Sequence, residues 1–194
     1  MSVERELKKI LAYAGVAAGL SMFAVGANAA PNPNFHIYIA YGQSNMAGNG
    51  DIVPSEDQAN PPKNFIMLAS HNANASQRSG KTNQSIKTGE WYPAIPPMFH
   101  PFENLSPADY FGRAMADSLP GVTVGIIPVA IGAVSIRAFD KDQYEAYFRG
   151  DGKDIMNWGW PKDYDNNPPG RILELAKKAK EVGVIKGFIF HLTI

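Results

Sequence analysis

The sequence predicts an α/β fold in which helices cover a parallel β-sheet. Three short apolar runs, at residues 35–40, 122–130 and 184–190, are rich in Ile, Val and Phe and fit buried strands. Amphipathic helix patterns lie between them, at residues 106–121 and 170–182. Strands that alternate with helices in this way are typical of parallel sheets with helical crossovers.

The first strand is predicted at Phe35–Ala40 (FHIYIA), which is apolar almost throughout. The first helix has a complete start signal, with Ser106 as N-cap, Pro107 in the first helical position and Asp109 in the first turn. Pro120 and Gly121 end it. The β-rich run at residues 122–130 (VTVGIIPVA) is the second buried strand.

The second helix is predicted at about residues 170–182, with Gly183 as its C-terminal cap. Its apolar residues fall on one face of a 3.6-residue period: Ile172, Leu175, Ala176 and Ala179. The third strand follows at residues 184–190 (VIKGFIF).

Two long segments, residues 50–105 and 137–169, show little periodicity and are predicted to be loops, with one candidate short strand at residues 65–69 (FIMLA). Loops of such length are uncommon unless they build a site.

The first 29 residues have the pattern of a secretory signal peptide: a charged start, an apolar run and the small residues Ala27–Ala29. The alternative is a membrane anchor, but the run is rich in Ala and Gly and ends in a cleavage motif. We therefore expect a secreted or periplasmic protein cleaved after Ala29, with residues 30–194 as its domain.

Composition excludes several classes of function. Removing the leader takes away Arg5, Lys8 and Lys9 against Glu4 and Glu6, so the formal net charge falls from 0 to −1. This gives no electrostatic reason to expect nucleic acid or anionic lipid as a partner. The chain has no Cys and therefore no disulfide, thiolate nucleophile or Cys-bound metal. We expect a monomer without metal or cofactor.

Ser44 is the first candidate for chemistry, because it follows the first strand and so lies at the carboxyl edge of a parallel sheet, where ligands bind. Gln43 and Asn45 beside it offer side-chain amides to a substrate. The alternative is that Gly-Gln-Ser-Asn is only good turn composition. The G-x-S-x-G spacing of the α/β-hydrolases is not matched.

A second candidate loop, at residues 128–139 (PVAIGAVSIRAF), follows the second strand at the same edge. Gly132 there could present a backbone N–H to an oxyanion, with Ser135 and Arg137 lining the pocket. A strand-ending turn for Gly132 and a structural ion pair for Arg137 are the alternatives.

Four ordered blocks together resemble a known family: IYIAYGQSNMAGNG, SPADYFGRAMAD, VGIIPVAIGAVSIRAF and KGFIFH. They are similar to the family 6 carbohydrate esterases, the acetylxylan esterases of the SGNH hydrolase group, which are related to the sialate O-acetylesterases. The resemblance implies a three-layer α/β/α sandwich with Ser44 as the nucleophile. It also implies an oxyanion hole that includes the N–H groups of Ser44 and Gly132.

The resemblance is incomplete at the third block, which in the family continues from His191 as Gln-Gly-Glu. Here Leu192, Thr193 and Ile194 follow instead, and the family's Asp-x-x-His block, which carries the base, is not in this sequence. The sequence therefore predicts a domain that lacks its C-terminal strands, helices, catalytic His and acid. Neither His71 nor His100 is expected to reach Ser44.

The segment at residues 139–167 sets aromatic rings among acids. Trp158 and Trp160 are candidates for a sugar-binding platform, although such rings could equally fasten the loop to the domain. We expect a secreted serine esterase that removes acetyl groups from acetylxylan through an acyl-enzyme. The alternatives are a sialate O-acetylesterase and a non-catalytic carbohydrate-binding module.

Overall fold

The structure is a computed structural model that describes residues 30–53, 60–78 and 82–192. The expected signal peptide lies outside these residues. Within them, no helix is both long enough and apolar enough to span a membrane.

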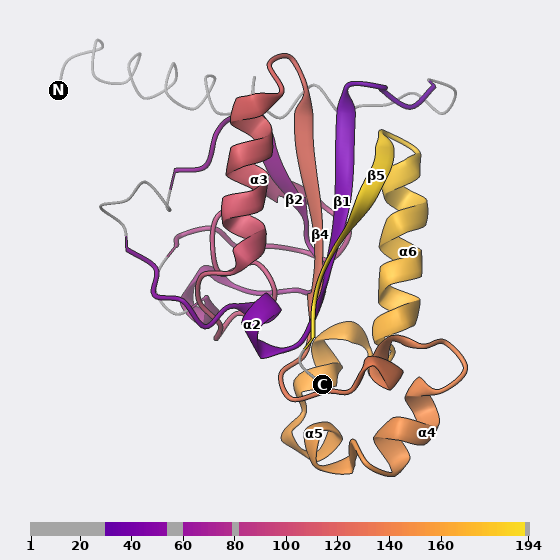
Figure 1. The fold of residues 1–194 in the computed structure, drawn as a ribbon. Coiled ribbons are helices and arrows are strands. Elements are labelled where there is room, and N and C mark those ends of the chain that lie inside the picture. Colours follow the sequence, from indigo (N-terminus) through magenta and orange to yellow (C-terminus); the bar gives the residue numbers. More distant parts are fainter. Residues whose placement is uncertain (1–29, 54–59, 79–81, 193–194) are drawn as a thin grey trace, which may run out of the picture. The chain divides into compact units, whose positions relative to one another are not determined.

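The centre of the domain is a five-stranded sheet in the order β3-β2-β4-β1-β5 (Figure 1). Its strands are β1 (Phe35–Gly42), β2 (Phe65–Leu68), β3 (Trp91–Pro93), β4 (Thr123–Ala130) and β5 (Val184–His191). Strands β2, β4, β1 and β5 are parallel, and only β3 is antiparallel to its neighbour. The predicted parallel sheet is confirmed, and β3 is an element that the sequence analysis missed.

The register brings three strand ends together. Strand β1 lies between β4 and β5, and its last residue, Gly42, is opposite Ala130 and His191. Segments that follow β1 and β4 therefore leave the sheet side by side. This is the edge at which ligands bind in open parallel sheets.

Helices cover both faces of the sheet, giving the predicted α/β/α layers (Figure 1). Alternate residues of β1 point to opposite faces: Tyr38 and Ala40 pack in the cluster under α3 (Pro107–Ser118), whereas Ile37 and Ile39 pack in the cluster under α6 (Pro168–Lys180). Because both faces are covered, the strand is apolar at every position except His36.

The start of α3 is the one predicted: Ser106 accepts a hydrogen bond from the N–H of Ala108, and Pro107 occupies the first turn. Helix α6 begins earlier than predicted, at Pro168, because the side chain of Asn167 caps it. It ends at Lys180 with Glu181 as the C-cap, so the prediction of Gly183 as the cap is wrong.

The prediction of an irregular loop at residues 137–169 is also wrong. The segment contains the short helices η4 (Ile136–Phe139), α4 (Tyr144–Arg149), α5 (Lys153–Trp158) and η5 (Trp160–Tyr164). None exceeds six residues, too few to show a helical period in the sequence. Their order comes from tertiary burial, chiefly of Tyr147, Phe148, Ile155 and Tyr164.

The other long segment is organised around a buried cation. The guanidinium of Arg78 is fully buried and donates hydrogen bonds to Gln84 and to the carbonyls of Ile95 and Pro97. No carboxylate among the described residues pairs with it, and burial lowers its pKa to about 10. These bonds join Arg78, Gln84 and residues 95–97, which are three stretches of one long connection. None of the three stretches belongs to a helix or a strand.

Strand β5 forms one edge of the sheet, and its side chains are mostly accessible. Phe188 and Phe190 are among the exposed large apolar residues, and Tyr41 of β1 packs against both rings. Strand β5 therefore presents exposed apolar rings at this side of the sheet.

Gly112 is the closest point of contact between α3 and the sheet. A Cβ there would lie 2.0 Å from the ring of Phe65 on β2. We expect Gly112→Ala to lower the free energy of unfolding by about 1–3 kcal/mol in urea titrations, despite the better helix propensity of Ala. Gly187→Ala on β5 is the matched control, since its Cβ would meet only Tyr38, at 3.8 Å. Equal stability of the two variants would contradict this packing.

Candidate active site

Strand β1 ends at a glycine because the backbone of β5 comes too close for any side chain. A Cβ at Gly42 would lie 1.9 Å from the carbonyl oxygen of His191, and the φ angle of 151° also favours glycine. The next N–H, of Gln43, donates to the same His191 oxygen at 3.0 Å. The turn that carries Ser44 is therefore fixed to the end of β5.

Ser44 begins a single helical turn, α2 (Ser44–Ala47), whose apolar residues Met46 and Ala47 are buried beneath it. Gly48 closes the turn by donating its N–H to the Ser44 carbonyl at 2.9 Å. The Ser44 side chain is half-buried, and its hydroxyl makes no hydrogen bond to the described residues. An accessible hydroxyl on a rigid turn is what a nucleophile requires.

Gly132 lies on the adjacent loop. The N–H of Ile131 donates to the carbonyl of Gly42 at 3.0 Å, so the pairing of β4 with β1 continues one residue beyond the strand ends. Gly132 follows directly, which brings its loop beside the Gln43–Ser44 turn. A Cβ at Gly132 would lie 2.7 Å from the indole of Trp160, and Ala133 has a left-handed φ of 59°.

The start of this loop is held by His100 and Tyr164. The His100 ring lies 2.8 Å, through Nε2, from the carbonyl oxygen of Ala130 and 2.7 Å, through Nδ1, from the carboxylate of Asp163. The Tyr164 hydroxyl is within hydrogen-bond distance of both the N–H and the carbonyl of Ala130. Burial alone would raise the pKa of Asp163, but the hydrogen bond and charge of His100 lower it.

A second buried histidine, His71, lies beside His100, with ring centroids 6.3 Å apart. Burial, together with the charges of His100 and two arginines, lowers the pKa of His71 to about 3. Its Nε2 has no hydrogen-bond partner among the described residues. His71 therefore stays neutral inside the domain.

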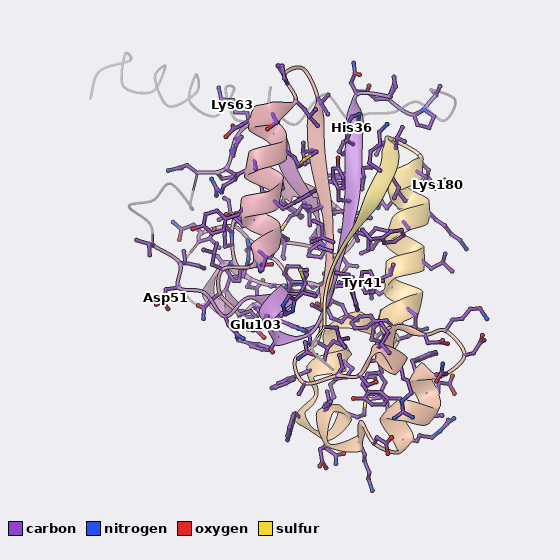
Figure 2. All side chains as sticks on the ribbon, viewed as in Figure 1. His36, Tyr41, Asp51, Lys63, Glu103 and Lys180 are labelled. Atoms are coloured by element: carbon purple, nitrogen blue, oxygen red, sulfur yellow. The ribbon has the colours of Figure 1, made fainter. Side chains whose placement is uncertain are left out.

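None of the four histidines forms a hydrogen bond with the Ser44 hydroxyl within the described part of the chain. His36 lies at the start of β1, at the opposite end of the strand from Tyr41 (Figure 2). Both ring nitrogens of His100 are occupied. His191 approaches the serine turn through its backbone. The general base is thus assigned to no described residue.

Glu103 is an acid that the sequence analysis did not consider. It lies near α2 (Figure 2), and its neighbour Asn104 donates to the carbonyl of Gly48 at 2.9 Å. Burial raises the pKa of Glu103, although the charge of His100 opposes this. No sequence signal marks Glu103, His100 or Tyr164, because their positions depend on how the two long segments fold.

The predicted substrate residues lie along the same edge but differ in availability. Asn45 is exposed and accepts a hydrogen bond from Asn49 at 3.2 Å, and Gln43 is half-buried. Arg137 forms an ion pair with Asp151 and lies over the ring of Tyr147. The alternative of a structural ion pair is therefore what the structure shows for Arg137.

Trp158 and Trp160 pack against one another with centroids 5.0 Å apart, and Trp158 is 58% exposed. Phe102, which the sequence analysis missed, adds a ring beside Trp160 at 6.5 Å and stacks on His100. Tyr147, Phe148 and Tyr164 of the same segment are buried and fasten it to the domain. The buried rings confirm that part of this segment is fastened to the domain, whereas sugar binding by Trp158 and Trp160 stays a prediction.

Within the described residues, no group of three or more His, Asp or Glu side chains is arranged to hold a metal ion.

A mostly parallel five-stranded sheet with helices on both faces defines the α/β/α class of folds, and Ser44 lies at its carboxyl edge. Residues 34–191 match the carbohydrate esterase family described as sialic acid-specific acetylesterase, and the chain belongs to this family. The predicted resemblance to carbohydrate esterases is therefore confirmed at the level of this family.

Two solved structures are similar to the chain. A protein from Arabidopsis thaliana is 18% identical, with a TM-score of 0.52, over 83% of this chain and 58% of that one. A carbohydrate acetylesterase from Xanthomonas citri is 20% identical, with a TM-score of 0.42, over 81% of this chain and 32% of that one. The first of these supports the fold. The chain thus spans less than two thirds of the length of either.

The buried neutral His71 should make stability depend on pH. As the pH falls below about 6.5, the unfolded chain binds a proton at His71, whereas the folded chain does not do so until about pH 3. Stability is therefore lost through this window as the pH falls, by about 2 kcal/mol between pH 7 and pH 5. Urea unfolding at the two pH values measures the loss.

His71→Gln removes the titrating group and should make this pH dependence shallower. Equal pH dependence in wild type and His71→Gln would show that another group is responsible.

Proposed function

We propose that this chain is a serine carbohydrate esterase domain that removes O-acetyl groups from a glycan. The observation that carries the proposal is the position of Ser44, whose half-buried hydroxyl has no hydrogen bond to the described residues and lies on a turn fixed between the ends of β4 and β5. The family of the chain supports the same chemistry.

In this proposal the Ser44 Oγ attacks the acetyl carbonyl carbon and transfers its proton to a general base. The N–H groups of Ser44 and Gly132 stabilise the oxyanion of the tetrahedral intermediate. Collapse of that intermediate breaks the ester bond, and the sugar oxygen leaves as a hydroxyl by taking up a proton. Water then attacks the acetyl-enzyme, releases acetate and returns the proton to Ser44.

A neutral plant glycan such as acetylxylan is the substrate we propose. A sialic acid carries a carboxylate that needs a cation, and Arg137, the cation nearest to Gly132 along the chain, is already paired with Asp151. The second candidate is a sialate O-acetylesterase, because the description of the matching family names sialic acid. We also propose export with cleavage after Ala29, which N-terminal sequencing of the exported protein would test.

Reaction with a fluorophosphonate probe tests the nucleophile. We expect one covalent adduct on Ser44, formed over hours rather than minutes because no histidine among the described residues activates the hydroxyl. Intact-mass spectrometry and peptide mapping locate the adduct. Ser44→Ala should not be labelled, whereas Ser118→Ala, at the exposed far end of α3, should be labelled like wild type. A folded wild-type chain without an adduct on Ser44 would refute the esterase proposal.

The oxyanion role of Gly132 gives a second prediction. In Gly132→Ala the new Cβ must displace the indole of Trp160, which moves the N–H at this position. We expect labelling of Ser44 to slow at least tenfold, the cost typical of a lost oxyanion donor. Gly187→Ala, where the added Cβ would meet only Tyr38, at 3.8 Å, is the control. Unchanged labelling of Gly132→Ala would exclude Gly132 from the oxyanion hole.

A further inference from the structure

A cleft of about 450 Å³ opens one residue beyond Ser44, between α2 and the start of α3. The residues that line it are Asn45, Asn49, Gly50, Leu105, Ser106, Pro107 and Tyr110. The loop that ends at Gly50 is joined to Leu105 by two backbone hydrogen bonds, of 3.2 and 2.8 Å, so two segments far apart in the sequence form one wall.

The lining is amphipathic in the way that a sugar ring requires. Tyr110, 55% exposed, and Leu105 give an apolar surface, and the amides of Asn45 and Asn49 give polar groups. The single bond between these amides leaves the Asn45 N–H donors and the Asn49 carbonyl without partners among the described residues. No lining residue is charged, which fits a neutral glycan.

The cleft and the tryptophan pair lie on opposite sides of the sheet. Met46 and Ala47 of α2 belong to the core cluster on the α3 face, whereas Trp160 packs on the cluster of the α6 face. Ser44 and Gly132 lie at the sheet edge between the two. In Figure 1, α2 lies below α3, and α5 lies below the lower end of the sheet.

We propose that the cleft is a second sugar-binding subsite and that the substrate is a polymer. One sugar of the glycan rests on Tyr110 in the cleft, the acetylated sugar lies at Ser44, and the chain continues over Trp160 and Trp158. This inference rests on the proposed function, because the acetylated unit is placed by Ser44. A site for a single sugar would need only one of the two surfaces.

Binding of acetylated xylo-oligosaccharides to the full chain carrying Ser44→Ala tests the proposal without turnover. By isothermal titration calorimetry, we expect a hexasaccharide to bind more tightly than an acetylated methyl xyloside. Adding Tyr110→Ala should weaken hexasaccharide binding about fivefold to tenfold, the value of one aromatic contact. Tyr110→Phe keeps the ring and should bind within about twofold of its parent. Trp158→Ala should weaken binding of the hexasaccharide to a similar degree.

Leu173→Ala is the matched control, because Leu173 is equally exposed, at 56%, on the outer face of α6. Asn49→Ala provides a second probe of the cleft should Tyr110→Ala fail to fold. The proposal is overturned if both cleft variants bind the hexasaccharide as Leu173→Ala does. It is also overturned if the hexasaccharide binds no more tightly than the methyl xyloside.

The two proposals fail in different ways. If Ser44 is labelled but the cleft variants bind the hexasaccharide normally, the esterase proposal holds and the proposal of a polymer site is refuted. If the cleft variants bind the hexasaccharide more weakly but Ser44 is not labelled, the chain is a glycan-binding domain and the esterase proposal is refuted.

Discussion

The pairing of β1 between β4 and β5 is the constraint on which the candidate site depends. At Gly42 the backbone of β5 comes so close that no Cβ fits, and the adjacent N–H of Gln43 bonds to the same His191 carbonyl. Ile131 extends the pairing on the other side. Because backbone bonds on both sides hold this turn, Ser44 is placed by the sheet itself, which is more rigid than a free loop.

The second constraint is the support beneath the Gly132 loop. His100 comes from one long connection and Tyr164 from the other, and both bond to Ala130. Asp163 completes the arrangement by pairing with His100 inside the domain. The two irregular segments therefore help to position the site, and removing one member would leave a buried polar group without its partner.

Much of the fold could be predicted from the sequence, because strong local signals coincide with burial. Residues 35–40 are apolar on both faces, and Ser106 and Pro107 mark a helix start by themselves. The short helices α4 and α5 could not be predicted, because six residues carry no period and their order comes from packing of Tyr147 and Ile155. Ser44 and Gly132 stood out through their places after strands, whereas His100 and Tyr110 had no local signal.

The contact between Trp160 and Gly132 links the evolution of two positions. Since the indole occupies the space that any side chain at residue 132 would need, a larger residue there requires a smaller one at residue 160. Trp160 also packs on the exposed Trp158. If the proposed glycan contact of Trp160 holds, a lineage that altered this ring would at the same time remove the surface that supports the glycine loop. Changes of specificity and of reactivity are therefore expected to be inherited together.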